Sequence, residues 1–220
     1  MKMLLNNYEN DIIFDNTYIN TLEILNKKAF YRFLKDINNL NDQDNILFFD
    51  NNEQINMDNK IFIIYNFINF DFNTKKITAS ILNIINNNMD EKDKDKINNL
   101  YNKLKDIYTH LLDNIDLNLE IQDEFKIEDI SKLMKPKINT KNNLLENILL
   151  LMDIESELNL DKLVVFVNLK SYLENEELIE LYKYSLYKDI KILLVDNHNY
   201  LTNNIEKKLQ IDEDLIEFMI

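Results

Sequence analysis

An acidic stretch in the second half of the chain carries the side chains best suited to binding a metal ion. From residue 115 to residue 122 apolar and polar residues alternate strictly, so an extended backbone would place the polar set on one face. Carboxylate and amide oxygens on that face, followed by further acids, match the ligands that calcium prefers. The residues concerned are Asp116, Asn118, Glu120, Asp123, Glu124 and Glu128.

This acidic stretch does not have the spacing of an EF-hand loop. If Asp116 is position 1, Ile121 occupies the position of the invariant glycine and Ile127 that of the bidentate glutamate. The same alternation also suits a strand whose polar edge faces solvent. The spacing therefore leaves both interpretations open, a calcium site and a solvated edge.

A cluster of lysines follows the acidic stretch directly. Lysines at this density can line a surface that faces phosphate groups, although ordinary surface lysines would have the same spacing. A lysine pair near the N-terminus is a smaller candidate of the same kind. The lysines that we consider for DNA binding are Lys132, Lys135, Lys137, Lys141, Lys27 and Lys28.

The overall composition restricts what these clusters can do. The chain has 220 residues, with 25 lysines and arginines against 39 acids, for a net charge of −14. Proteins that bind nucleic acid usually show a basic surface, so binding here would depend on a local lysine cluster or on cations that neutralise acids. The chain has no glycine, which excludes a glycine-rich phosphate loop and the Rossmann fingerprint. It has no cysteine, which excludes disulfides and thiolate metal sites.

Carboxylates at the ends of apolar segments give the best enzymatic alternative. Asp50, Asn168 and Asp196 each follow such a segment, and acids at strand ends can hold magnesium in phosphoryl-transfer enzymes. Such residues also terminate strands as turn formers, and no nucleophile, base or phosphate loop accompanies them. His110 and His198 lack a histidine partner at zinc-ligand spacing. We therefore expect a protein that is not an enzyme, with a magnesium-dependent phosphoesterase or nuclease as the alternative.

Apolar runs predict the sheet that would carry these residues. Runs of this length without polar interruption suit strands covered on both faces, as in parallel α/β folds. The last two runs are separated by a helix-length segment, 174–187, with apolar residues at helical spacing, which predicts a βαβ unit. The four predicted strands are 46–49, 61–64, 163–167 and 190–195.

The middle of the chain has the periodicity of helices instead. Ile97, Leu100, Leu104, Ile107 and Leu111 form one apolar seam, and similar patterns occur over 77–85 and 144–152. Pro136, the sole proline, should interrupt a helix. We therefore predict an α/β head domain from residues 1–70 and 151–220, with a helical leg domain, 71–150, inserted into it.

The chain lacks the signals of a membrane or exported protein. Polar residues interrupt the N-terminal apolar stretch early, and no run of about 18 apolar residues occurs. We therefore expect a cytoplasmic protein.

Taken together, these segments resemble the Csn-two family, the accessory adaptation proteins of type II-A CRISPR systems. The similarity is strongest over KIFIIYNFINFDFNTKKITASIL, residues 60–82, and over 163–220, which includes LVVFVNLKSYLENEELIELYKYS and IKILLVDN. ILFFD, residues 46–50, resembles the early strand of the family. The acids Asp116, Glu120, Asp123, Glu124 and Glu128 match the family's acidic stretch in type, and Asn118 stands where an acid is usual.

The resemblance implies a head related to nucleotide-hydrolase folds that has lost its phosphate loop. It further implies a homotetrameric ring that encloses double-stranded DNA, holds calcium and binds DNA ends without sequence preference. The expected partners are the integrase complex that inserts new spacers and the effector nuclease. Lys132 and Lys137 match lysines that follow the acids in the family.

Overall fold

The computed structural model describes residues 1–40, 45–68, 71–112, 115, 117, 119, 126–160 and 163–220. The chain divides into two compact units, unit 1 (1–70 with 140–220) and unit 2 (71–139). In the predicted division residues 140–150 belong to the leg, whereas here they lie in unit 1. None of the described helices is long and apolar enough to cross a membrane.

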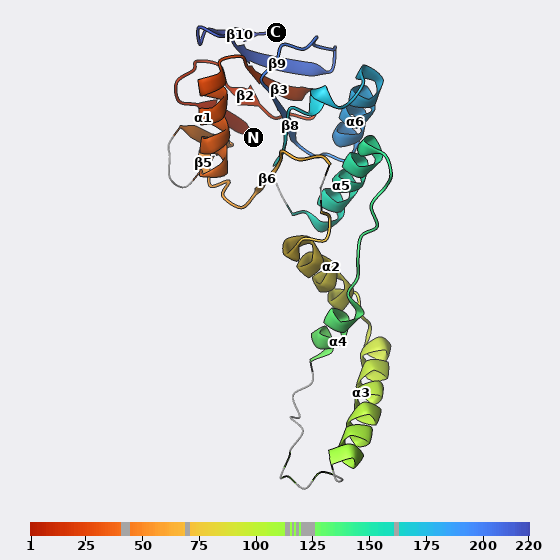
Figure 1. The fold of residues 1–220 in the computed structure, drawn as a ribbon. Helices are drawn as coiled ribbons and strands as arrows, with labels where there is room; N and C mark the ends of the chain where they lie inside the picture. The colour runs from red at the N-terminus through yellow and green to blue at the C-terminus, as the bar shows by residue number, and fades with distance from the viewer. Residues whose placement is uncertain are drawn as a thin grey trace. The chain divides into compact units, whose positions relative to one another are not determined.

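A six-stranded sheet forms the centre of unit 1 (Figure 1). Five of its strands run parallel, in the order β9-β3-β8-β7-β6, and β10 pairs antiparallel with β9 at one edge. The strands are β3 (Ile19–Ile24), β6 (Ile61–Ile64), β7 (Leu163–Val167), β8 (Ile192–Asp196), β9 (Glu206–Ile211) and β10 (Glu217–Met219).

The predicted βαβ unit is confirmed. Strand β7, helix α6 (Asn175–Tyr187) and strand β8 follow one another, and Val165 of β7 lies beside Leu193 of β8 in parallel register. All five residues of each of these strands are buried, as expected for strands covered on both faces. Glu177 caps helix α6 by accepting a hydrogen bond from the Glu174 amide.

One predicted strand lies in a different sheet. Residues 46–49 belong to β4 (Ile46–Asp50), which is part of a second, antiparallel sheet with the order β2-β1-β4-β5. Its residues alternate between buried and half-buried, because only one face of this small sheet packs against the core. An apolar run that is only half-buried looks like a central strand in the sequence, so the expectation of a parallel strand here was wrong. The other strands are β1 (Lys2–Leu5), β2 (Ile12–Ile13) and β5 (Glu53–Ile55).

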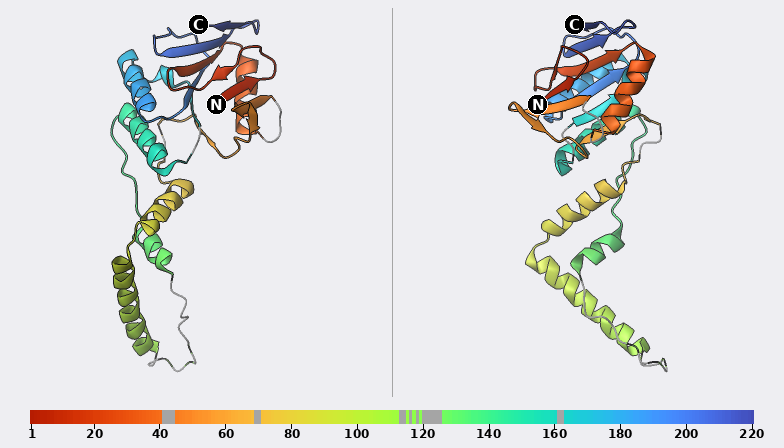
Figure 2. Two further views of the ribbon diagram at one scale, coloured as in Figure 1. Left: turned by 180° about the vertical axis from the view of Figure 1, so that it is seen from behind. Right: turned by 90° about the vertical axis from the view of Figure 1, so that its left-hand side faces the viewer.

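The main hydrophobic core lies on one face of the six-stranded sheet. Leu22 and Leu193 of that face, Phe33 of helix α1 (Lys27–Asn38), and Met3 and Phe48 of the small sheet belong to one buried cluster. Helix α5 (Leu144–Leu158) packs against α6, and in Figures 1 and 2 both lie on the opposite side of the sheet from α1. The short 3-10 helix η1 (Leu169–Ser171) follows β7.

Unit 2 consists of helices within its described residues, namely α2 (Lys75–Asn87), α3 (Glu91–Leu112) and α4 (Ile127–Met134). Helix α4 contacts both α2 and α3 (Figure 2). The predicted seam does lie on one helix, yet Leu100, Leu104 and Ile107 of α3 are 60%, 50% and 56% exposed. The helix predicted over 144–152 is α5, and α4 ends at Met134, just before Pro136.

Candidate nucleic-acid interface

The exposed face of helix α1 carries the densest set of cations in the described part of unit 1. Lys27, Lys28, Arg32 and Lys35 are all exposed, no acid interrupts them between positions 27 and 35, and Tyr31 is 70% exposed among them. Residues three or four apart lie on the same side of a helix, so Lys28, Arg32 and Lys35 form one stripe. In a chain with a net charge of −14, this stripe is a local positive surface.

The local sequence explains how α1 holds this face outward. Phe33 and Ile37 are buried on its inner side, where they join the main core. Only two residues, Leu25 and Asn26, connect β3 to α1. The Asn26 side chain accepts hydrogen bonds from the amides of Lys28 and Ala29, both 3.1 Å long. The first helical amides therefore already have an acceptor, so phosphate contacts at this helix would come from its side chains.

Two of these lysines occupy positions that do not favour the helix itself. Lys27 and Lys28 form its first turn, where the helix dipole is positive, and that turn contains no acid. A cation there costs the helix a few tenths of a kcal/mol, up to about 1 kcal/mol. Lys27 and Lys28 therefore add positive charge to the surface at a small cost to the stability of the helix.

The structure places the six predicted lysines in both units. In unit 2, Lys132 lies in α4, and Lys135, the residue that follows this helix, has a left-handed backbone (φ 46°). Lys135 and Lys137 are exposed. In unit 1, the exposed Lys141 donates its amide proton to Asn147 Oδ1 (2.8 Å), and Lys27 and Lys28 begin α1.

Arg32 and Lys35 were not among the residues predicted to bind DNA. Arg32 is the only arginine of the chain, and it lies four residues after Lys28. The signal was present, because four cations without an acid in nine residues of an acidic chain is unusual. Lys28, Arg32 and Lys35 form one surface stripe only when residues 27–38 are helical, and that helix was not predicted.

Most of the predicted calcium ligands fall outside the described residues. This holds for Asp116, Glu120, Asp123 and Glu124, while Glu128 belongs to helix α4. Among the residues that the structure does describe, no group of three or more histidines or acids could hold a metal ion. The calcium site therefore stays a prediction.

The acids of the enzymatic alternative do not converge. Asp50 forms an ion pair with the amino group of Met1 (3.5 Å) and borders a cleft that Lys191 also lines. Lys191 precedes β8, whereas Asp196 is its last residue, so about 16 Å of strand separates the two ends. Asp50 thus lies by the cleft at the start of β8, and Asp196 lies at the other end of that strand. Asn168 accepts a hydrogen bond from the Asn197 amide (3.2 Å) and closes the turn after β7.

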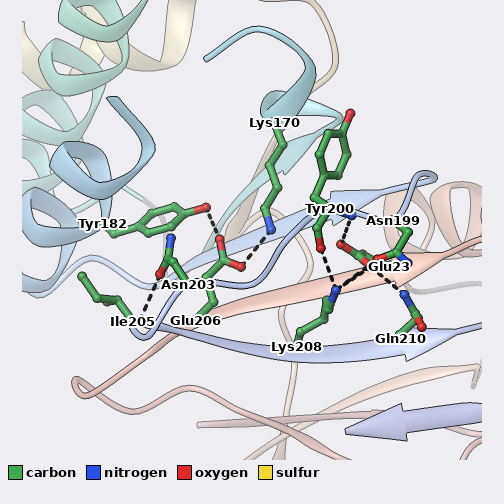
Figure 3. Close-up of polar contacts among 10 residues, drawn as sticks. All are labelled: Glu23, Lys170, Tyr182, Asn199, Tyr200, Asn203, Ile205, Glu206, Lys208 and Gln210. Atoms are coloured by element: carbon green, nitrogen blue, oxygen red, sulfur yellow. Dashed lines mark hydrogen bonds and ion pairs between the residues drawn. The ribbon is translucent and has the colours of Figure 1, made fainter. Parts of the chain in front are cut away.

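Figure 3 shows a cluster of buried charges. Its residues on β3 and β9 alternate with residues of the main core, so the cluster lies on the opposite face of the sheet. Lys170 of η1 pairs with Glu206 of β9 (3.0 Å), and Tyr182 of α6 donates a 2.5 Å hydrogen bond to the same carboxylate. Lys208 of β9 pairs with Glu23 of β3 (3.0 Å). All four charged side chains are at most 3% exposed, and a buried charge is tolerated only when it is paired.

This cluster fixes an unusual crossover between two parallel strands. The segment 197–205, which we call the crossover, leads from β8 to β9 with no helix in it. Lys208 Nζ donates to the Tyr200 carbonyl (2.8 Å), and the Tyr200 amide donates to Glu23 Oε1 (3.0 Å). Backbone groups that a helix would satisfy internally are here bonded by buried side chains.

The described geometry comprises a parallel α/β unit with a basic helix on its surface and a second, helical unit. A family model described as CRISPR-associated protein (Cas_Csn2) matches residues 39–215, which is most of the chain. The match includes β4, helix α2 and the βαβ unit, which lie in the segments where the sequence resemblance is strongest. The chain therefore belongs to this family of CRISPR-associated proteins.

Proposed function

We propose that the protein is a non-enzymatic ring that binds the ends of double-stranded DNA, with calcium, during CRISPR spacer acquisition. The observation that carries the proposal is the exposed basic face of α1, in a chain that is otherwise strongly acidic. Membership of the CRISPR-associated family supports the biological setting. The integrase complex and the effector nuclease are its proposed partners.

The exposed seam on α3 supports self-association. Leu100, Leu104, Ile107 and Leu111 are each at least half exposed, and a row of apolar side chains along one helix suits the matching row of a second copy. A homotetramer would repeat the α1 stripe and the lysines after α4 once in each subunit. A closed ring of such copies would load DNA only from a free end.

Calcium would act on the charge balance. Four subunits at −14 each would repel DNA, and salt at cellular strength screens charges only beyond about 8 Å. Calcium bound among the acids of 116–128 would cancel part of that charge beside Lys132, Lys135 and Lys137. Contacts to phosphate carry no sequence information, so binding would be independent of sequence and sensitive to salt.

The decisive experiment compares linear with closed circular duplex DNA in a gel-shift assay with calcium. The proposal requires that linear duplex be retained and that circular duplex of the same sequence be bound far more weakly. Retention of neither form would support a scaffold that binds only proteins. Equal binding of linear DNA in excess chelator would remove calcium from the proposal.

The enzymatic alternative has its own test. Labelled DNA is incubated with the protein and magnesium, and products are followed with time. Turnover that disappears in Asp50→Ala or in Asp196→Ala would favour a phosphoesterase and contradict the non-enzymatic proposal. The absence of turnover in the native protein is the result that we expect.

A further inference from the structure

Asp196 is a buried carboxyl group without a hydrogen-bond donor. It ends strand β8, is 0% exposed, and within the described part of the chain neither of its side-chain oxygens has a hydrogen-bond partner. Glu23 lies directly beside it in the register of β3 and β8, so the two side chains share one face of the sheet. Glu23, by contrast, receives hydrogen bonds from Lys208, Gln210 and the Tyr200 amide.

The charged groups on the neighbouring elements are paired with one another, and Asp196 belongs to neither pair. Glu23 of β3 and Lys208 of β9 compensate each other, as do Glu206 of β9 and Lys170 of η1, with the Tyr182 hydroxyl of α6 on Glu206. An ionised Asp196 would add an unbalanced negative charge in a site that excludes water. When two carboxyl groups share a site and one holds all the donors, the other retains its proton.

The electrostatics of the site agree with this geometry. Burial raises the pKa of Asp196 from its ordinary value of 3.8 to about 7, with Lys170 opposing the shift and Glu23 and Glu206 adding to it. The Asp196 carboxyl group therefore loses its proton within the range of cellular pH.

The same charged groups hold the crossover 197–205 in place. Lys208 and Glu23 bind the backbone of Tyr200, and the Lys170 ammonium lies 6.0 Å from the centre of the Tyr200 ring. Asp196 is the residue that immediately precedes this segment. A carboxylate formed at Asp196 would compete with Glu206 for Lys170 and would repel Glu23, which holds Lys208 and the Tyr200 amide.

We propose that Asp196 is a proton switch for the crossover: the neutral side chain leaves both ion pairs intact and the segment docked, and the carboxylate loosens 197–205 from the sheet. This inference concerns unit 1 alone and does not depend on the DNA-binding proposal. The only ligand it requires is a proton.

The first test is the pH dependence of equilibrium urea unfolding. Folding takes up a proton when the pKa is higher in the folded protein, so the contribution of Asp196 to stability falls as pH rises and is lost through about pH 7. Between pH 5.5 and 8 this group should make the folding equilibrium roughly thirty-fold less favourable. Asp196→Asn, which keeps the shape and cannot ionise, should lose that part of the dependence.

Asp214→Asn is the matched control, because Asp214 is an exposed aspartate of the same unit. It should keep the pH dependence of the native protein. If Asp196→Asn and Asp214→Asn follow the same curve as the native protein, Asp196 does not titrate in this range and the proposal is wrong.

Hydrogen exchange links the titration to the crossover. The Tyr200 amide, which donates to Glu23, should lose protection between pH 6 and pH 8 in the native protein, after correction for the intrinsic effect of pH. In Asp196→Asn its protection should stay constant. Unchanged protection in the native protein would mean that the proton does not control the segment.

A measurement on the native protein covers the case in which Asp196→Asn fails to fold. Infrared spectroscopy detects the C=O stretch of a protonated carboxyl group, and at pH 6 exposed acids are already ionised. A band that is present at pH 6 and lost by pH 8 is expected. Its absence at pH 6 would contradict the switch without the use of any variant.

Discussion

Glu23 and Asp196 show how neighbouring residues of one chemical type acquire different roles. They lie side by side on adjacent strands, yet Glu23 accepts hydrogen bonds from an ammonium, an amide side chain and a backbone N–H, and Asp196 accepts none from the described residues. Burial alone would penalise both charges. The difference comes from Lys208 and Gln210 on β9, which reach Glu23 because β9 lies beside β3. Strand order therefore decides which of the two acids receives the hydrogen-bond donors.

Truncation of Lys170 should be strongly destabilising. In Lys170→Ala the buried Glu206 carboxylate loses its ammonium partner and keeps only the Tyr182 hydroxyl, and breaking a buried pair in this way costs about 3–5 kcal/mol. Urea unfolding of the variant measures this cost. Lys188→Ala serves as control, since Lys188 pairs with Asp153 on the surface, and its effect should be far smaller. Equal costs for the two variants would contradict the importance assigned to the buried pair.

At the level of single residues, the sequence predicted where a residue lies in a strand better than it predicted the burial and the partners of that residue. Asp196 was expected at a strand end and lies there, and Asn168 likewise follows β7. The buried pairs join residues 36 and 185 positions apart in the chain. Lys170 and Glu206 look like ordinary surface residues in the sequence, because no local pattern encodes a partner that folding brings from such a distance.

At the level of elements, helix α1 begins at a side-chain cap, Asn26, that also joins the helix to another part of unit 1. Asn26 accepts from two helical amides and also donates through Nδ2 to the Glu213 carbonyl (2.8 Å), which ties the start of the helix to the turn before β10. The cap therefore both begins the helix and positions its basic face.

Asn26→Ala should destabilise unit 1 by about 1 kcal/mol, the usual cost of losing an N-cap. It should also weaken DNA binding less than a change of charge on the helix does, because the cations remain. Thermal unfolding and a gel shift on the same preparation separate the two effects. Asn26→Asp, which retains the acceptor for the helical amides, is the matched control and should keep most of the stability.

The charge of α1 has a separate test. Lys28→Glu combined with Arg32→Glu should weaken duplex binding and reduce the slope of log affinity against log salt by about 0.9 for each phosphate that the helix no longer neutralises. Lys183→Glu, on the exposed side of α6, is the control and should change binding little. An unchanged slope in the double variant would show that α1 does not face DNA.

The sequence predicted the elements whose pattern is local and continuous. Strands β6, β7 and β8 with helix α6 follow from apolar runs and helical spacing. Strands β3 and β9 carry charged or polar residues such as Glu23, Lys207 and Lys208, so their apolar runs are interrupted and these strands were missed. In β3 and β9 polar residues are buried because the crossover covers them, which is a tertiary effect that no short window of sequence contains.

For the whole molecule, the exposed seam on α3 offers a test of the proposed self-association. Leu100→Lys with Leu104→Lys should lower the mass of the oligomer measured by sedimentation velocity, because charges on an apolar interface are costly to bury. Asn102→Lys, about half a turn away on the same helix, should leave the mass unchanged. An oligomer that survives the double change must associate through another surface.

Within the described residues, the Asn73 side chain joins the first and last segments of unit 2. Asn73 accepts the Ile138 amide proton (2.8 Å) and donates to the Ile138 carbonyl (3.2 Å), so residues 65 positions apart meet as neighbours. The chain therefore enters and leaves unit 2 at neighbouring positions. Because these two positions are neighbours, we expect that a short peptide joining them could replace the helices of unit 2 and leave unit 1 able to fold.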